Sequence, residues 1–210
     1  MESRRFQAHP WHGIDIGSDA PAVINAFIEI VPSDTVKYEI DKESGHLKVD
    51  RPQLYSSLAP APYGFIPQTY CGPRIAELCS LRSGKDVLEG DGDPLDICVL
   101  SEHKFPHGDI LLRAVPIGGL RLIDRKQADD KIIAVLQHDD VYGRWSDISD
   151  CVPGLLARLQ HYFLTYKAMP GEFREVEIAN VYGREEAHEV IRTARADYED
   201  RFPNASAAAD

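Results

Sequence analysis

Short runs of alternating apolar and polar residues dominate the chain from residue 21 to 136, and they limit the possible folds more than any other feature. Such alternation has the period of two that half-buried strands require. Residues 36–51 hold two of these runs on either side of a KESG turn, which predicts a β-hairpin. Further strand-like runs lie at 22–31, 96–100, 109–123 and 131–136. The chain therefore predicts several short strands before any clear helix.

Two amphipathic helices are expected after the strands. Residues 151–169 and 185–202 carry apolar side chains at the three-and-four spacing of a helix with one buried face, and Pro153 stands where a first helical turn accepts proline. Strands first and helices last predict an α+β fold in which a curled sheet or barrel is flanked by C-terminal helices. Residues 71–89 lack a clear period, and we interpret them as an insertion between strands.

A single domain is expected to account for the whole chain, residues 1–210. The hydrophobic fraction of 43% is enough for one core, with residues 1–20 as an extension and 203–210 as a frayed tail. The four cysteines show no CxxC spacing, which favours thiols over a zinc site or a disulfide. The sequence has neither the apolar run of a secretory signal nor the roughly 20 apolar residues of a membrane helix. We therefore expect a cytoplasmic protein with no membrane partner.

Three aspartates lie within six residues in the segment EGDGDPLD. Asp91, Asp93 and Asp96 repel one another, and they precede the apolar run ICVL. Each carboxylate costs free energy near an apolar surface unless a proton or a cation neutralises it. The spacing does not fit an EF-hand, because Asp96 stands where that loop needs glycine. A solvated turn is the competing interpretation, since aspartate, glycine and proline are common turn residues.

A second acidic group favours a metal site over a solvated turn. Asp124, Asp129 and Asp130 lie in a turn between two strand-like runs, and Lys131 follows directly. Mg²⁺ prefers oxygen ligands and bridges to substrate phosphates. Two cations that share a carboxylate lower the pKa of a water held between them, and a nearby aspartate can then accept its proton. Asp93, which is flanked by two candidate ligands, is placed for that role.

Residues suited to a phosphate substrate are also present. Lys37 and Arg51 lie at the two ends of the predicted hairpin, and Tyr166 and Lys167 lie at the end of the first predicted helix. Taken singly, each has an ordinary explanation as a solvated or core residue. Together with the two acidic groups, they predict a site that holds metals through carboxylates and phosphate through cations.

Seven motifs in order resemble one known family. They are VINAFIEI, KYEIDKESG, VDR, PYGFIP, DGDPLD, DDK and HYFLTYK, within residues 23–182. This combination resembles the soluble inorganic pyrophosphatases built on an OB-like barrel. The resemblance implies an α+β fold with a five-stranded OB-like β-barrel, additional short strands and flanking C-terminal helices.

The resemblance also implies a reaction and the residues that perform it. The reaction is hydrolysis of inorganic pyrophosphate to two orthophosphates by a metal-activated water, with several Mg²⁺ ions per site and Mn²⁺ as the alternative. A homo-oligomer is implied, with the hexamer common among bacterial relatives. Asp93 corresponds to the proton acceptor. The metal-binding residues implied are Asp91, Asp96, Asp124, Asp129, Glu29 and Glu39. The phosphate-binding residues implied are Lys37, Arg51, Tyr63, Lys131, Tyr166 and Lys167.

The chain departs from the family pattern in places. Ala59 stands where bacterial members often carry tyrosine, and Pro62 where they often carry asparagine. Tyr55 is a candidate to replace the missing tyrosine. Residues 71–89 form a longer segment than in compact bacterial members, and it could cover the site, build an oligomer interface or decorate the surface. Asp130 is an alternative to Asp129 as a metal ligand.

Two alternative functions remain open at this point. A metal-dependent hydrolase of a larger phosphoanhydride would want an aromatic platform for a nucleobase, for which Phe65 and Tyr70 are candidates. A non-catalytic OB-fold module would bind single-stranded nucleic acid. The net charge of −11, from 34 acidic and 23 basic side chains, disfavours that partner. Pyrophosphate is therefore the expected partner, and nucleic acid is not.

Overall fold

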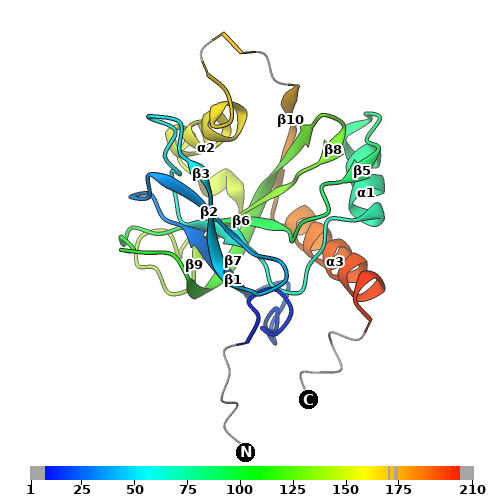
Figure 1. Ribbon diagram of the computed structural model, residues 1–210, viewed down its shortest axis with the longest axis horizontal. Helices are drawn as coiled ribbons and strands as arrows, with labels where there is room; N and C mark the ends of the chain where they lie inside the picture. The colour runs from blue at the N-terminus through cyan, green and yellow to red at the C-terminus, as the bar shows by residue number, and fades with distance from the viewer. Residues whose placement is uncertain (1–7, 170, 173–174, 204–210) are drawn as a thin grey trace, which may run out of the picture.

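The described part of the chain forms a β-barrel with helices packed outside it (Figure 1). This computed structural model describes residues 8–169, 171–172 and 175–203. The strands are β1 (Ile24–Ile30), β2 (Val36–Ile40), β3 (Leu47–Pro52), β4 (Tyr63–Phe65), β5 (Glu89–Gly90), β6 (Asp96–Leu100), β7 (Ile110–Asp124), β8 (Gln127–Ala128), β9 (Lys131–Leu136) and β10 (Val176–Gly183). The helices are α1 (Pro73–Ser83), the 3₁₀ helix η1 (Ile148–Asp150), α2 (Pro153–Thr165) and α3 (Arg184–Arg201).

Five strands close into a ring, which confirms the predicted barrel. β1, β4, β6, β9 and β7 are hydrogen-bonded in that order, and β1 also pairs with β7. β6 and β9 run parallel, whereas the other neighbours in the ring run antiparallel. β7 is 15 residues long and changes register between Pro116 and Gly118. This irregularity lets its first half pair with β1 and its second half with β10.

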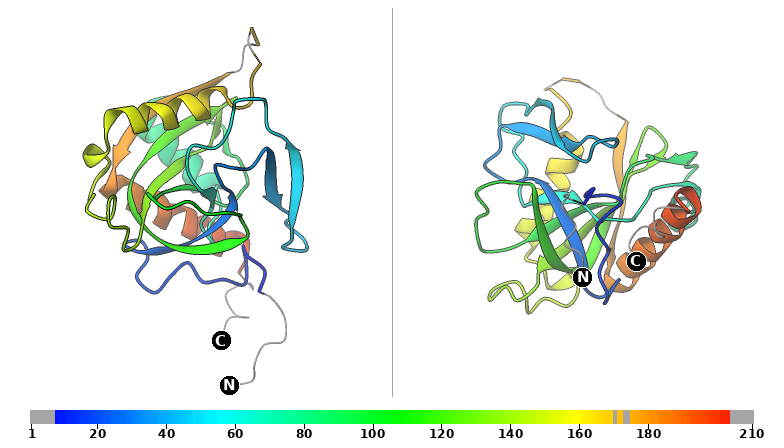
Figure 2. Two further views of the ribbon diagram at one scale, coloured as in Figure 1. Left: turned by 90° about the vertical axis from the view of Figure 1, so that its left-hand side faces the viewer. Right: turned by 60° about the horizontal axis from the view of Figure 1, so that its bottom comes forward.

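The hairpin predicted at residues 36–51 is confirmed as a separate two-stranded sheet. β2 pairs antiparallel with β3, and Lys37 lies opposite Arg51. Figure 2 shows the hairpin standing beside the barrel, outside the ring of strands. Two basic residues of the predicted site therefore lie side by side on an element that projects from the barrel.

The segment at 71–89, predicted as an insertion without a clear period, contains helix α1. Its N-terminus is capped by a side chain from another helix. The Asp197 carboxylate of α3 accepts hydrogen bonds from the backbone N–H groups of Gly72, Arg74 and Ile75, at 3.0–3.1 Å. These N–H groups lack partners inside their own helix. The signal for α1 was therefore missing locally, because its cap lies more than 120 residues away in the chain.

The expected order of strands before helices is wrong in two places. α1 lies between β4 and β5, and β10 lies between α2 and α3. β10 pairs antiparallel with the second half of β7 and so extends the sheet beyond the ring. The helices predicted at 151–169 and 185–202 are confirmed as α2 and α3.

The N-terminal extension, predicted as residues 1–20, packs on the fold from residue 8 onward. Trp11 is buried, and its indole N–H donates to the carbonyl of Thr69 at 2.8 Å. His12 stacks on Trp11 and lies 2.8 Å from the hydroxyl of Tyr198 through Nδ1. His12 is therefore part of an aromatic cluster with Trp11 and Tyr198. The tail predicted at 203–210 lies outside the described residues from 204 onward.

The four cysteines are free thiols, as their spacing predicted. Cys71, Cys79, Cys98 and Cys151 are all buried and free. Over residues 8–169, 171–172 and 175–203, we find no helix with the length and apolar character needed to cross a bilayer.

Candidate active site

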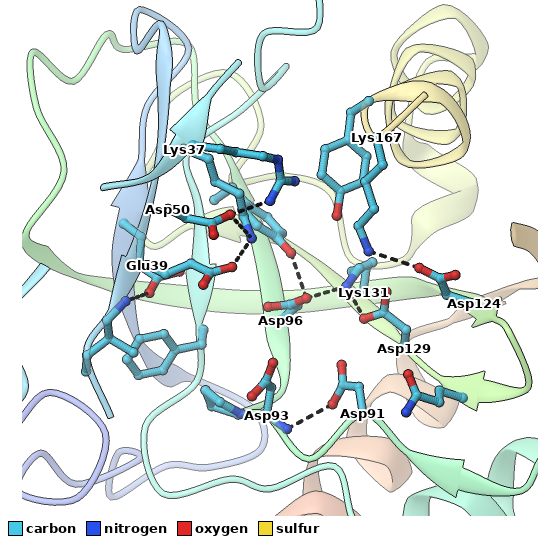
Figure 3. A pocket seen from close by; sticks show the side chains of 18 of the residues that line it. Lys37, Glu39, Asp50, Asp91, Asp93, Asp96, Asp124, Asp129, Lys131 and Lys167 are labelled. Carbon is cyan, nitrogen blue, oxygen red and sulfur yellow. Dashed lines mark hydrogen bonds and ion pairs between the residues drawn. The ribbon is translucent and has the colours of Figure 1, made fainter. Parts of the chain in front are cut away.

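A pocket of about 340 Å³ opens between the hairpin, the barrel and the C-terminal end of α2 (Figure 3). Every residue of the predicted site lines it. These residues are Glu29, Lys37, Glu39, Arg51, Tyr63, Asp91, Asp93, Asp96, Asp124, Asp129, Lys131, Tyr166 and Lys167. The fold thus brings the first acidic group, two aspartates of the second group and all the predicted basic residues into one cavity.

The turn before β6 directs its carboxylates into this pocket. Gly92 has a φ of 76°, a left-handed conformation that glycine adopts without strain. Across this turn, the backbone N–H of Asp93 donates to the Asp91 carboxylate at 3.0 Å, and Asp96 follows as the first residue of β6. Burial, followed by repulsion from the Asp129 carboxylate, raises the pKa of Asp91 well above its usual range. The cost of crowding, inferred from sequence, is therefore present in the fold.

The three residues DDK alternate between two faces at the start of β9. Successive side chains of an extended backbone point in opposite directions. Asp129 and Lys131 line the pocket, whereas the Asp130 side chain is 3% exposed and bonds to Arg121 and Tyr182 behind it. The structure thus places Asp129, not Asp130, in the pocket.

Lys131 lies between two carboxylates at the centre of the pocket (Figure 3). The parallel register of β6 and β9 sets Lys131 beside Asp96, and its ammonium contacts the carboxylates of Asp96 and Asp129. The hydroxyl of Tyr63 donates to Asp96 at 2.6 Å. Burial acts to lower the pKa of Lys131, but the carboxylates of Asp129 and Asp96 outweigh it and raise that pKa well above its usual value. Lys131 therefore remains a cation in this site.

The hairpin supplies one wall of the pocket. The ammonium of Lys37 contacts the Glu39 carboxylate and lies 3.7 Å from that of Asp50. The Arg51 guanidinium also contacts Asp50, and it lies 6.0 Å from the ring centroid of Tyr166 at the end of α2. Arg51 therefore connects the hairpin to the end of α2 across the pocket.

The opposite wall comes from the end of α2 and the end of β7. The ammonium of Lys167 donates to the Asp124 carboxylate at 3.0 Å. Burial acts to lower the pKa of Lys167, and the neighbouring Tyr166 and Asp129 raise it, with a net rise. Asp124 is the last residue of β7, so the length of that strand sets its position.

Glu29 connects the barrel to the hairpin from inside. Its residue exposure is 7%, and its carboxylate accepts the backbone N–H of Ile40 at 2.7 Å. Burial, as the largest cause, raises the pKa of Glu29 to about 8. The carboxyl group of Glu29 therefore ionises near neutral pH only when additional positive charge lies close to it.

Three polar residues of the pocket were missed in the sequence analysis. They are Lys42, Asp50 and Gln127. The Lys42 ammonium contacts the Asp93 carboxylate from the hairpin turn. Lys42 and Asp50 lie within the motifs KESG and VDR, so their signal was present, but it was interpreted only as turn and strand chemistry.

The geometry excludes one suggested role for each of two departures from the family pattern. Tyr55 is 83% exposed and is absent from the described pocket lining, so it does not replace the tyrosine missing at Ala59. α1, inside the segment 71–89, contributes no described residue to the lining and packs against α3 instead. That segment therefore does not cover the pocket.

The donor set of the pocket fits a hard divalent cation. Carboxylate oxygens are the ligands such ions prefer. Within the described residues, no three His, Cys, Asp or Glu side chains converge closely enough to define a metal site by distance alone. The fit comes from charge, because burial first and neighbouring carboxylates second raise the pKa of Asp91, and burial raises that of Asp96. A divalent cation would offset both the burial and the repulsion.

Comparison with known proteins places the chain in a family. A family model described as inorganic pyrophosphatase matches residues 26–199. The chain belongs to the inorganic pyrophosphatase family. The family resemblance inferred from motifs is therefore confirmed, and membership implies a divalent metal cofactor.

Individual relatives of this inorganic pyrophosphatase family member agree. The inorganic pyrophosphatase of Chlamydia muridarum (strain MoPn / Nigg) is 52% identical over 195 residues, which cover 90% of this chain and 93% of that protein. The soluble inorganic pyrophosphatase of Zea mays is 39% identical over 193 residues, covering 91% and 80% respectively. The crystal structure of inorganic pyrophosphatase from Thermus thermophilus superposes with a TM-score of 0.75 at 30% identity, covering 90% of this chain and 99% of that one.

Proposed function

We propose that this chain hydrolyses inorganic pyrophosphate to two orthophosphates and uses Mg²⁺ as its metal. The observation that carries the proposal is that one pocket gathers both signs of charge. Pyrophosphate in complex with Mg²⁺ still carries negative charge, so a pocket of carboxylates alone would repel it. A pocket of lysines alone would not assemble the metal. Family membership supports the same reaction.

The carboxylates divide into two roles in this proposal. When bound, Mg²⁺ supplies Lewis acidity and lowers the pKa of a water molecule, which makes a nucleophile available near neutral pH. Asp91, Asp96 and Asp129 would hold the activating metals, and Asp124, with Asp129, would hold the metal that accompanies the substrate. Glu29 and Glu39 would act on the metals through water.

The remaining residues of the pocket act on the proton and on the phosphates. A water oxygen forms a bond to one phosphorus, and the bridging P–O bond breaks. Asp93 accepts the proton of the attacking water on its carboxylate. Lys37, Arg51 and Lys167 stabilise the negative charge that develops on the leaving phosphate, since fixed cations need no reorganisation during the reaction. Tyr63, Lys131 and Tyr166 complete the phosphate-binding wall.

Further statements belong to the same proposal. The metal is Mg²⁺, with Mn²⁺ as the alternative, and the carboxylate donor set suits both ions. The chain forms a homo-oligomer, with a hexamer as the form to test, and it acts in the cytoplasm. Sedimentation velocity of the purified protein measures the oligomeric state, and fractionation of the source cells measures the location.

The experiment that tests the function is a phosphate-release assay on purified protein. Pyrophosphate, ATP and tripolyphosphate are offered separately, with Mg²⁺ and then with a chelator. Rapid Mg²⁺-dependent release from pyrophosphate alone is expected. Preferred hydrolysis of ATP would favour the larger phosphoanhydride hypothesis, although Phe65, which lines the pocket, is 1% exposed and offers no open face for a base. Oligonucleotide binding without turnover would favour the binding module.

A further inference from the structure

A buried polar cluster lies directly behind the pocket. Asp130 accepts hydrogen bonds from the guanidinium of Arg121 at 3.3 Å and from the hydroxyl of Tyr182 at 3.0 Å. Arg121 on β7 is 1% exposed and also donates to Glu186 of α3 at 2.7 Å. We call Arg121, Asp130 and Tyr182 the rear network. It joins β7, β10 and the residue before β9, and through Glu186 also α3, and none of its three residues lines the pocket.

The chain makes room for this network with a glycine. A Cβ atom at position 119 would lie 2.4 Å from the ring of Tyr182, which is closer than real contacts allow. Gly119 therefore permits the ring to lie over β7, with its hydroxyl directed at Asp130. The same ring lies 4.9 Å from the Arg121 guanidinium. The three side chains of the rear network thus hold one another in a single arrangement.

Stability alone is a poor explanation for the rear network. Burial of charged groups costs free energy, and apolar side chains of similar volume often stabilise a core as well or better. The pairing is also incomplete, because Nε of Arg121 and Oδ1 of Asp130 are buried without a hydrogen-bond partner in the described structure. A specific arrangement is what such a network supplies.

The position of Asp130 in the chain shows what is arranged. Asp130 lies between Asp129 and Lys131, and its side chain points away from the pocket while theirs point into it. Asp129 and Asp130 directly precede β9, and Lys131 is its first residue, so the three side chains share one short stretch of backbone. Fastening Asp130 from behind therefore fixes the direction in which the Asp129 carboxylate and the Lys131 ammonium face the pocket.

We propose that Arg121, Asp130 and Tyr182 are positioning residues that set the orientation of Asp129 and Lys131 in the active site. The proposal rests on the proposed function, in which Asp129 holds metal and Lys131 holds phosphate. Residues that orient metal ligands typically contribute 10–100-fold to metal affinity or activity. The rear network reaches its ligand through the backbone, and the expected loss is at the lower end of that range.

The test uses the smallest change available, Tyr182→Phe, which keeps the ring over Gly119 and removes one hydroxyl. Mg²⁺ binding to the substrate-free protein is measured by titration calorimetry, well below the unfolding temperature. Affinity is expected to fall about tenfold, while kcat and KM for pyrophosphate are measured on the same sample. Tyr198→Phe is the matched control, because it also removes a buried phenol hydroxyl, which bonds to His12 near the C-terminal end of α3, whereas the rear network contacts the first turn of that helix.

A purely structural role would lower the unfolding temperature of Tyr182→Phe and leave Mg²⁺ affinity at the wild-type value, and that result would overturn the proposal. Equal losses of Mg²⁺ affinity in Tyr198→Phe would overturn it too. Asp130→Asn is the second variant, and it should lose at least as much Mg²⁺ affinity as Tyr182→Phe. If Asp130→Asn does not fold, Tyr182→Phe decides alone.

The proposed function fails separately from this inference. Wild-type protein that binds Mg²⁺ but releases no phosphate would refute the pyrophosphatase proposal, while the Mg²⁺ titrations still decide the positioning role. Wild-type protein that neither binds Mg²⁺ nor releases phosphate would refute both.

Discussion

Single side chains in this pocket depend on close partners of opposite charge. Lys131 contacts Asp96 and Asp129, and Lys42 contacts Asp93. These contacts keep carboxylates and cations together in a space that neither sign could occupy alone at this density. The consequence for function is that removal of one charge should leave its partner uncompensated, so effects on activity should exceed those at exposed sites.

Asp93→Asn tests the proton acceptor. The amide keeps the shape of the side chain and cannot accept the proton, so kcat should fall by about 10²–10⁴-fold, the usual contribution of a general base. Phosphate release from pyrophosphate measures the loss, and circular dichroism verifies the fold. Asp86→Asn, at an exposed aspartate outside the pocket, is the control and should retain wild-type activity. Turnover of Asp93→Asn within threefold of wild type would remove Asp93 from the mechanism.

Variants of Lys37 and Arg51 on the hairpin test the proposed binding of the phosphates. Lys37→Ala and Arg51→Ala should each lower kcat/KM for pyrophosphate by about 10²-fold, because a fixed charge near the leaving phosphate is lost. Lys48→Ala on the same hairpin is the control, since Lys48 is exposed and pairs with Asp41 outside the pocket. Steady-state kinetics at saturating Mg²⁺ compare the three. Equal parameters for all of them would mean that the hairpin does not contact the substrate.

At the scale of elements, α1 shows how one helix can depend on another for its start. Its first N–H groups bond to the Asp197 carboxylate of α3, and Gly84 ends it in a left-handed conformation. Buried N–H groups without partners are costly, so α1 and α3 should lose stability together. The catalytic pocket lies on other elements and should be unaffected.

Asp197→Ala should lower the free energy of unfolding by about 2 kcal/mol, since loss of a helix cap costs about 0.5–2 kcal/mol and here several N–H groups lose one acceptor. Urea unfolding followed by circular dichroism measures the change. Asp200→Ala, one turn later on the exposed face of α3, is the control with an expected change below about 0.5 kcal/mol. A neutral Asp197→Ala would show that α1 begins without this cap.

At the scale of the whole molecule, the N-terminal extension is bound to the C-terminal helix through His12 and Tyr198. Burial, and secondarily the charge of His9, lowers the pKa of His12 to about 4. The usual value is about 6.5 in an unfolded chain. Between these values the unfolded chain binds a proton that the folded chain does not, so the His12 contribution to stability is complete above about pH 6.5 and decreases as pH falls toward 4.

The matching variant is His12→Gln. Its deficit in free energy of unfolding relative to wild type should be largest near pH 7 and should shrink steadily toward about pH 4.5, because the wild type loses the His12 contribution there. Urea unfolding at about pH 7, 5.5 and 4.5 measures the difference. His161→Gln, at an exposed position of α2, is the control and should show a small deficit that is constant with pH. A constant deficit for His12→Gln would contradict the pKa-based explanation.

The sequence by itself predicted four of the five barrel strands (β1, β6, β7 and β9), the hairpin, both C-terminal helices and 13 residues that line the pocket, whereas β4 was not among the predicted strands. Alternation and helical periodicity are local patterns, and they report which face of a segment is buried without reference to distant residues. The charged motifs were informative for a similar reason, since DGDPLD and DDK concentrate like charges that only a cation or a proton makes tolerable near a core.

Tertiary structure alone decided where α1 begins, how β10 pairs and which of Asp129 and Asp130 faces the pocket. Each of these depends on a partner outside its own segment, namely Asp197 for α1, the second half of β7 for β10, and Arg121 with Tyr182 for Asp130. A one-residue shift in an extended segment exchanges its two faces, and only the contacts on both sides of the sheet can select one. Local motifs therefore identified residues that line the pocket, and long-range contacts set the directions in which those residues point.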